Sequence, residues 1–294
     1  MSLNKFLDNK DVKKKFHQEF PKPEFSIKRE LLATPSSELY FLVGIAFHYL
    51  MGFYLEYLNP KAIAPKRWIA EDILSALNEL EVIKSGGKLK SWRGIKEPDL
   101  QLYPELSKAR NIISEAKENH SIFLQNGEIT DNLVRSALLL APLDEYYRRG
   151  VVDKNIGLVD VKIVEDLRKM ISLVDANIFK ANEICILSPT FGEASLLIGG
   201  ADADLIIDDM LIEIKTSKKL ELQRDYFNQL IGYYALYKIG GINDMPKKHE
   251  IKRFGIYFSR YGYLHVININ DIIGNKTFPG FLQWFKEKAK EMYG

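Results

Sequence analysis

The sequence has little of what marks several common classes of protein. Its 294 residues include one cysteine, Cys185, which excludes an intrachain disulfide and any zinc or iron–sulfur site built from four cysteines. No apolar signal segment follows Met1, no apolar run reaches the ~18 residues of a membrane span, and there is no GxxxxGK[ST] phosphate loop. We therefore expect a cytoplasmic protein with no membrane partner, no iron–sulfur cluster and no ATPase site.

The sequence also has almost no net charge. Its 41 Lys and Arg and 39 Asp and Glu give a formal net charge of +2, so a surface for nucleic acid has to be a local patch. The hydrophobic content of 46% and charged content of 27% are typical of an ordinary globular protein. The length suits one large domain or two smaller ones, and the composition leaves the oligomeric state unknown.

Local patterns predict an α+β core that carries a helical insertion. Residues 1–30 are polar and basic, so residues 1–35 are predicted to form an N-terminal arm or a short helix that leads into the fold. The Thr34-Pro35-Ser36-Ser37-Glu38 segment begins a helix of about 38–58 whose apolar surface suits the interior. We expect residues 36–60 and 181–294 to form the core, a central mixed sheet flanked by helices, and residues 61–180 to form the helical lobe. The predicted core elements are strands at about 183–188, 194–199, 203–207 and 210–216, a helix at 222–239, strands near 252–258 and 262–268, and a helix at 278–292.

A predicted β-hairpin between residues 203 and 215 gathers polar side chains. Two β-rich apolar runs, 205–207 and 210–215, flank Asp208-Asp209, which is a two-residue turn signal. A hairpin closed there pairs Ile207 with Met210, Leu205 with Ile212, Asp204 with Glu213, and Asp202 with Lys215. Because side chains alternate along a strand, the four polar residues share one face.

Facing carboxylates need a neutralising partner. Opposed residues on paired strands have Cβ atoms roughly 4.5–5.5 Å apart, and like charges at that distance repel. Mg²⁺ prefers oxygen ligands and commonly binds through one or two carboxylates, water and substrate phosphate. The face therefore predicts a divalent-cation site with Lys215 beside the attacking water. A solvated face with no function is the alternative.

Two further elements supply candidate residues. His48 lies on the apolar helix, where it is either a core histidine or a metal ligand. Gln229 and Tyr233 are four residues apart on the later helix and share a face, where they contact phosphate or the metal site, or pack as part of an aromatic face. Lys218, Lys219 and Arg224 follow the second hairpin strand and are placed to meet phosphate. A basic segment with a tryptophan, 84–96, is either a nucleic-acid contact or a solvated loop.

Taken in order, these motifs resemble the PD-(D/E)xK nuclease superfamily, in the branch of RecB-type and lambda-exonuclease-like domains. The residues that carry the resemblance are Gly44-x-x-x-His48, Asp204, Glu213-Ile214-Lys215 and Gln229-Leu230-Ile231-Gly232-Tyr233. The matched parts are about 36–58 and 183–270, so the 61–180 segment gains no interpretation. The resemblance implies a restriction-endonuclease-like fold and a metal-dependent nuclease that hydrolyses DNA.

The resemblance also implies a role for each matched residue. Asp204, Glu213 and the Ile214 carbonyl would bind Mg²⁺ or Mn²⁺, with His48 as the ligand from the first helix. Lys215 would be the catalytic lysine, and Gln229 and Tyr233 the third motif. Asp202 competes with Asp204 for the ligand role, and the iron–sulfur cysteines of several RecB-type relatives are absent. An exonuclease in repair, phage or defence work is the favoured function; a non-catalytic nucleic-acid-binding module and an RNA or branched-DNA endonuclease are the alternatives.

Overall fold

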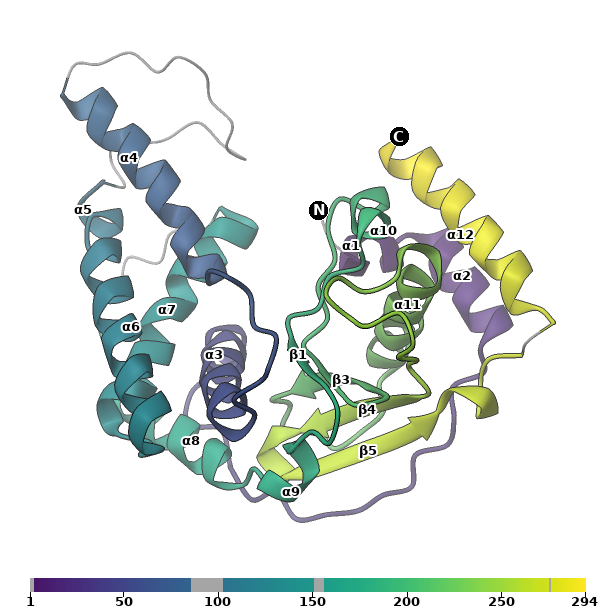
Figure 1. The fold of residues 1–294 in the computed structure, drawn as a ribbon, viewed down its shortest axis with the longest axis horizontal. Coiled ribbons are helices and arrows are strands. Elements are labelled where there is room, and N and C mark those ends of the chain that lie inside the picture. Colours follow the sequence, from purple (N-terminus) through teal and green to yellow (C-terminus); the bar gives the residue numbers. More distant parts are fainter. Residues whose placement is uncertain (1–2, 86–102, 151–155, 275) are drawn as a thin grey trace. The chain divides into compact units, whose positions relative to one another are not determined.

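The chain forms an α+β structure, as the sequence predicts, and its residues divide into two compact units (Figure 1). The computed structural model describes residues 3–85, 103–150, 156–274 and 276–294. The sheet unit comprises residues 1–31, 61–64 and 175–294, and the helical unit comprises residues 32–60 and 65–174. Most of the basic 84–96 segment lies outside the described residues.

The helical unit is built around one long apolar helix. Its elements are α3 (Tyr40–Leu58), η1 (Ile69–Asp72), α4 (Ile73–Lys84), α5 (Tyr103–Leu106), α6 (Ala109–Asn126), α7 (Asp131–Arg149) and α8 (Val161–Ser172). Helix α3 packs on α6, α7 and α8, so the expected grouping of residues 36–60 with the sheet differs from the observed division. The apolar surface of α3 is satisfied by neighbouring helices, a choice of partner that an amphipathicity pattern does not specify.

Helix α3 is long enough and apolar enough to cross a membrane, judged by length and mean hydropathy alone. No uninterrupted apolar run of that length was found in the sequence, because a few polar residues interrupt this helix. Its mean hydropathy is nevertheless 1.4. The buried core helix of a globular protein can have the same length and hydropathy. Several apolar residues of α3 are buried inside the structure, among them Val43, Phe47, Leu50 and Phe53.

The sheet unit contains five strands in the spatial order β1-β2-β3-β4-β5. They are β1 (Cys185–Leu187), β2 (Leu205–Ile207), β3 (Met210–Lys215), β4 (Arg253–Phe258) and β5 (Tyr263–Asn268). Neighbours are antiparallel except β3 and β4, which are parallel. Helix α11 (Arg224–Gly240) makes the crossover that a parallel pair requires. The sheet is therefore mixed, as predicted.

One predicted strand is wrong. Residues 194–199 were expected to be extended, but α10 (Glu193–Leu197) is a short helix. Ala194, Ser195 and Ile198 are buried whereas Leu196 is 76% exposed, which is a helical spacing and not a strict alternation. Ser195 Oγ accepts the Phe191 N–H and donates to the Ala201 carbonyl, at 2.9 and 3.0 Å, and so fixes this compact connection between β1 and β2.

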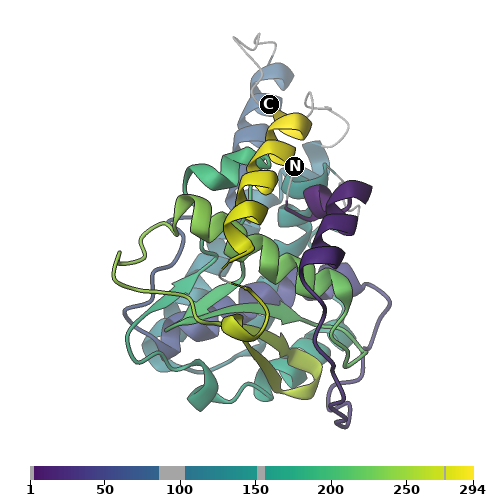
Figure 2. The same ribbon diagram turned by 90° about the vertical axis from the view of Figure 1, so that its right-hand side faces the viewer.

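The N-terminal residues pack on the core of the sheet unit and do not form a separate arm. Helices α1 (Leu3–Leu7) and α2 (Lys10–Glu19) lie beside α11 and the C-terminal helix α12 (Phe278–Tyr293) (Figures 1 and 2). Phe16 and Phe20 contact Phe281 edge to face, with ring centroids 5.1 and 4.7 Å apart. The segment was judged by its basic composition, although Phe16 and Phe20 are four residues apart, which is a helical spacing, and both are buried. On the opposite face of the sheet, Phe179 of α9 (Ala176–Phe179) contacts Tyr257.

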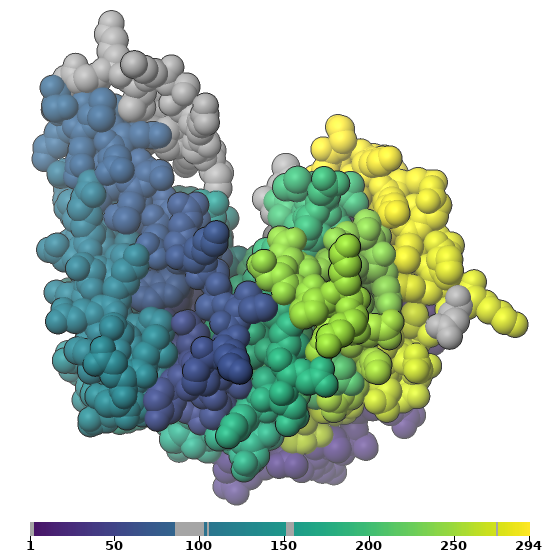
Figure 3. All heavy atoms as spheres, in the orientation of Figure 1, coloured from purple at the N-terminus to yellow at the C-terminus, as the bar shows by residue number. Residues whose placement is uncertain are grey.

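The segment after α11 closes over the connection between β1 and β2. Figure 3 shows this segment, in light green, lying against the green connection between β1 and β2. Asn243 donates from its backbone to the Thr190 carbonyl at 2.9 Å and from its side chain to Thr190 Oγ1 at 2.7 Å. These bonds hold in place the loop that leads into Phe191 and α10.

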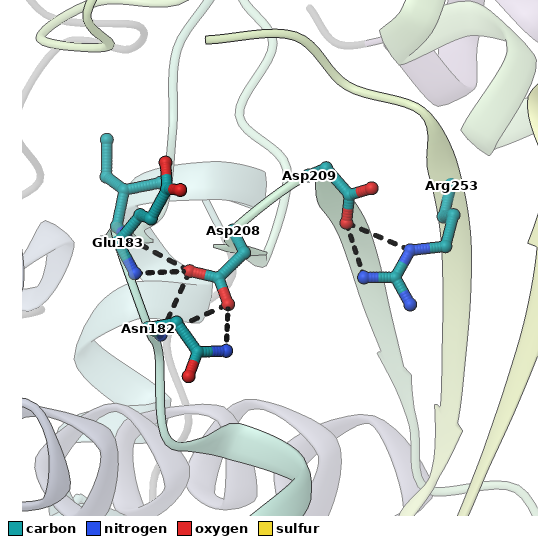
Figure 4. A network of polar contacts seen from close by, with 6 residues as sticks. Asn182, Glu183, Asp208, Asp209 and Arg253 are labelled. Carbon is teal, nitrogen blue, oxygen red and sulfur yellow. Dashed lines mark hydrogen bonds and ion pairs between the residues drawn. The ribbon is translucent and has the colours of Figure 1, made fainter.

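The β2–β3 turn is held by two acids with separate partners (Figure 4). Asp208, with φ of +50°, accepts the backbone N–H groups of Asn182, Glu183 and Ile184 through Oδ1, at 2.8–3.2 Å. Asp209 forms an ion pair with Arg253 at the start of β4. The turn therefore ties β2 and β3 to both neighbouring strands.

We expect Asp208→Ala to lower the free energy of unfolding by about 1–3 kcal/mol, because three N–H groups lose an acceptor and a left-handed residue gains strain. Asp208→Asn, which keeps an acceptor and tolerates positive φ, should cost less than half as much. Asp244→Asn is the control, since Asp244 also has positive φ, +61°, but is exposed. Equal costs for the two Asp208 variants would contradict this account.

The same contacts set a pH dependence. Burial raises the pKa of Asp208, but the N–H bonds from Glu183, Asn182 and Ile184 outweigh it and hold the pKa below its ordinary value. A carboxylate with a depressed folded-state pKa stabilises above the unfolded pKa, near 4 for Asp, and loses that contribution as pH falls through the folded pKa. Urea titrations at pH 7 and pH 3 should show a smaller pH effect in Asp208→Asn than in the wild type.

Candidate functional site

Polar side chains meet at the end of β3, on the sheet face covered by α11. Leu211, Glu213 and Lys215 alternate along β3 and point to the same side. Leu211 is fully buried in the core under α11. Glu213 and Lys215 continue that row beyond the apolar core, and their side chains are 2% and 17% exposed. The row therefore runs from the core to the surface.

The predicted hairpin register is confirmed around the acid pair. Leu205 pairs with Ile212 and Ile207 with Met210. One residue before β2, Asp204 accepts the Ile214 N–H through Oδ2 at 2.7 Å. Asp204 is therefore brought to β3 beside Glu213.

The predicted pairing of Asp202 with Lys215 is wrong. The chain leaves the hairpin before Asp204: the Ala203 N–H donates to the Pro189 carbonyl at 3.0 Å, and Asp202 forms an isolated bridge with Thr190. The connection contains three glycines with positive φ, Gly192, Gly199 and Gly200. The prediction continued the strand pairing of the hairpin back to Asp202 and ignored these turns. Asp204 is the acid in contact with β3.

Lys215 is the centre of the cluster. Its Nζ lies 2.8 Å from Glu213 Oε2 and donates to Gln229 Oε1 at 2.9 Å. Gln229 in turn donates through Nε2 to the Tyr233 hydroxyl at 3.0 Å. The i, i+4 pair on α11 thus joins the cluster as its shared face predicts, and it fixes the lysine from the helix side.

Two aromatic rings complete the surroundings. The Tyr226 ring lies under the Lys215 ammonium, 4.7 Å from Nζ to the ring centroid. The Tyr233 ring stacks on Phe191 at 5.4 Å with an interplanar angle of 16°. Neither Tyr226 nor Phe191 belongs to the motifs from which the site is predicted. The spacing of Tyr226 three residues before Gln229 is a signal that could have found it, whereas nothing local points to Phe191.

The electrostatics of the site favour a shared proton or a cation. Burial, together with the Asp204 carboxylate, raises the pKa of Glu213 to about 8. Burial lowers the pKa of Lys215, but attraction to Glu213 and Asp204 outweighs it and leaves that pKa above its ordinary value. One ammonium group therefore faces two carboxyl groups that cannot readily ionise together.

The acid pair fits a divalent cation by its donor chemistry. Glu213 Oε2 is bound by Lys215, but Glu213 Oε1 is buried and has no hydrogen-bond partner among the described residues. Asp204 is partly buried and Glu213 is 2% exposed, so both acids lie at the edge of the core. In the described part of the chain no group of three or more His, Cys, Asp or Glu side chains could hold a metal, and Mg²⁺ bound through two carboxylates would complete its shell with water and phosphate.

The other predicted site residues lie on α3, after β3 and at the start of α11. His48 is a partly buried residue of α3 in the helical unit. Lys218 and Lys219 are exposed after β3, as a phosphate contact requires. Arg224 donates to the Phe16 and Phe20 carbonyls at 2.6 and 2.8 Å, and so connects α2 to α11. Arg260, two residues after β4, is 1% exposed and donates to the Thr216 carbonyl.

Comparison with known proteins gives no relative: no protein-family model matches the sequence, and no curated protein or solved structure is significantly similar to the chain. The function is therefore inferred from the chemistry of the cluster at β3 and α11.

Proposed function

We propose that this protein is a metal-dependent nuclease that hydrolyses DNA phosphodiester bonds, with Asp204, Glu213 and Lys215 at its active site. The observation that carries the proposal is the polar cluster at the C-terminal end of β3. Lys215 is hydrogen-bonded to Glu213 and to Gln229 of α11, and Asp204 is hydrogen-bonded to the Ile214 N–H between them. The order of these residues and the elements that carry them are those of the PD-(D/E)xK resemblance. A purely structural cluster has no need of two facing acids.

Phosphodiester hydrolysis needs an attacking water, neutralisation of charge that develops on phosphate, and help for the leaving oxygen. A Mg²⁺ or Mn²⁺ ion held by Asp204 and Glu213 would lower the pKa of a bound water and offset the phosphate charge. Lys215 would then orient the water and stabilise the transition-state charge. Gln229 holds Nζ of Lys215, so its part is to position the lysine and not to contact the reacting atoms.

The metal-free arrangement also explains why the acids can coexist. Burial and the Asp204 carboxylate raise the pKa of Glu213, which favours its protonated form when no metal is bound and so relieves repulsion from Asp204. Asp204 and Glu213 would hold a divalent cation as deprotonated carboxylates, so its binding would take the place of that proton. Glu213 Oε1, which has no hydrogen-bond partner among the described residues, would be free to serve as a ligand.

The direct test is cleavage of linear, nicked and single-stranded DNA and of RNA by the purified protein with Mg²⁺, Mn²⁺ or EDTA. We expect metal-dependent cleavage of DNA, and loss of that cleavage in Glu213→Gln. Calorimetry should show Mn²⁺ binding to the wild type that weakens at least ~10-fold in the variant, as removal of a carboxylate ligand implies.

Asp202→Asn is the matched control, since the main chain of Asp202 pairs with Thr190, whereas Asp204 binds the Ile214 N–H of β3. It should retain most of the activity and the Mn²⁺ affinity. If the wild type leaves every substrate intact, or if Glu213→Gln cleaves as well as the wild type, the proposal fails; Mn²⁺ binding without cleavage of any substrate would favour a binding module.

A further inference from the structure

Three side chains lie in a row along one face of α11. Tyr226, Gln229 and Tyr233 occupy positions i, i+3 and i+7, so they share that face of the helix. Tyr233 is buried, whereas Tyr226 and Gln229 are partly exposed. Gln229 and Tyr233 belong to the motif from which the site is predicted. Tyr226 lies outside that motif, and its ring lies under the Lys215 ammonium.

The Lys215 ammonium has charged and uncharged partners. Glu213 Oε2 lies 2.8 Å from Nζ, and the charge of Asp204 adds to the attraction. The uncharged partners are Gln229 Oε1, at 2.9 Å, and the Tyr226 ring, whose centroid lies 4.7 Å from Nζ. An ammonium over an aromatic face is attracted by the negative potential of the π electrons, more strongly when water is excluded. The Lys215 side chain is 17% exposed, so this contact is largely shielded from water.

The two kinds of partner respond differently to a divalent cation at the acid pair. The positive charge of a bound cation offsets the two carboxylates, so the attraction of the pair for the Lys215 ammonium falls. Of the described contacts of Lys215, those with Gln229 and the Tyr226 ring keep their strength, because neither partner is charged. A single hydrogen bond to Gln229 leaves the ammonium free to swing about it. The ring restricts that swing from one side.

We propose that Tyr226 is a positioning residue, whose ring holds the Lys215 ammonium in place whatever the charge of the acid pair. The contact between ammonium and ring stands on geometry alone, whereas its consequence for DNA cleavage rests on the proposed function. Tyr226 is in the first turn of α11, and the start of that helix is fixed because Arg224 donates to two main-chain carbonyls at the end of α2. The ring is therefore carried by an anchored element.

The first test needs no catalysis. An aromatic ring shifts the NMR signals of protons above its face upfield, and the ε-methylene signal of Lys215 in ¹³C-lysine-labelled protein is assigned by its loss in Lys215→Met. We expect this signal upfield of the exposed lysines in the wild type, with and without Mg²⁺, and in Glu213→Gln, which removes the counter-charge. In Tyr226→Leu it should join the exposed lysines. An unshifted wild-type signal, or loss of the shift with Mg²⁺ or in Glu213→Gln, overturns the proposal.

The second test measures the part of the ring in DNA cleavage. Position 226 is occupied by phenylalanine, or by phenylalanine with one, two or three ring fluorines, which withdraw π density and change the shape of the ring little. We expect log kcat to fall steadily with each fluorine while KM stays near the wild-type value. Tyr226→Leu should lower kcat by about 3- to 30-fold, the range that the strength of a cation–π contact implies. Circular dichroism checks that each variant is folded.

Tyr237→Leu is the matched control, because the Tyr237 ring lies on the same helix and makes the same kind of contact with Lys238, 4.9 Å from Nζ to the centroid. Its kcat should stay near that of the wild type. A fluorinated series with constant kcat, or a rise in KM alone, as for a ring that stacks on a base, overturns the positioning role. The expected NMR shifts in a protein that cleaves nothing would support the contact and overturn only the nuclease.

Discussion

Replacement of Lys215 by alanine is expected to lower kcat for DNA cleavage by at least ~10²-fold, the scale measured when one preorganised donor to a developing charge is removed. The substituted side chain loses its 2.8 Å contact with Glu213 and its hydrogen bond to Gln229. Lys215 is the cation whose charge acts on both acids of the pair, and that charge is lost with its side chain. Steady-state kinetics with Mg²⁺ at saturating DNA measure the effect.

A folded variant is needed to interpret that loss. Removal of Lys215 leaves Glu213 buried without its counter-charge, and we expect Glu213 to hold its proton more tightly, since the neutral acid is the form that tolerates burial. Lys215→Met retains the aliphatic stem and its packing on Tyr226, and should show the same loss of kcat with a melting temperature near that of the wild type. Circular dichroism and thermal unfolding check both variants.

Lys218→Ala and Lys219→Ala are the matched controls. Both lysines are exposed on the segment that follows β3, and the Lys218 main chain is fixed by a hydrogen bond from the Tyr261 hydroxyl to the Lys218 carbonyl. If these lysines contact phosphate, their loss raises KM by a few fold at low salt and leaves kcat near the wild-type value. A Lys215→Ala enzyme with kcat unchanged would remove Lys215 from the mechanism.

The hairpin and its acid pair were predictable from sequence because their determinants are local. A two-residue acidic turn between β-rich runs sets the register, and the period of two then places Glu213 and Lys215 on one face. The same reasoning failed at Asp202, because the connection before β2 turns on the left-handed Gly199 and Gly200 and is held by contacts to Pro189 and Thr190. Pro189 and Thr190 lie outside the two hairpin strands, so the alternation along those strands does not predict these contacts.

Helix partners were harder to predict than the helices. The i, i+4 spacing of Gln229 and Tyr233 predicted a shared face, and the hydrogen bond between them agrees with it. The apolar helix α3 was predicted almost to its ends, yet hydrophobicity does not say whether it packs on a sheet or on helices. The family resemblance implied that α3 belongs to the core with the sheet, whereas the structure groups α3 with the helical unit. A role for His48 at a metal therefore remains a hypothesis, separate from the evidence for Asp204 and Glu213.

The largest expected effect on stability lies in the helical unit, at Asp144. This carboxylate, 4% exposed, accepts the Tyr49 hydroxyl at 2.9 Å and the Arg148 Nε–H at 2.6 Å. Tyr49 in turn accepts the Ala70 N–H at 3.1 Å. Three elements, α3, α7 and η1, are therefore joined through one buried acid.

Asp144→Ala should lower the free energy of unfolding of the helical unit by about 2–4 kcal/mol, somewhat below the ~3–5 kcal/mol typical of a broken buried pair. The discount reflects Arg148, whose side chain is 39% exposed and can be hydrated again after its partner is lost. Tyr49→Phe keeps the ring and the ion pair, and should cost about 1–2 kcal/mol through the unpaired Ala70 N–H. The coupling between the two sites should be visible in a double-mutant cycle.

Arg149→Ala is the control for this prediction. Arg149 forms the neighbouring i, i+4 ion pair with Glu145 on the same helix at 3.0 Å, but its side chain is 53% exposed, so its loss should cost no more than about 1 kcal/mol. Urea unfolding followed by tryptophan fluorescence reports on the helical unit through Trp68, which lies 6.3 Å from Tyr49 between ring centroids. If Asp144→Ala shifts the transition no further than Arg149→Ala, the buried acid does not hold these three elements together, because breaking its contacts would then cost no more than breaking a surface pair.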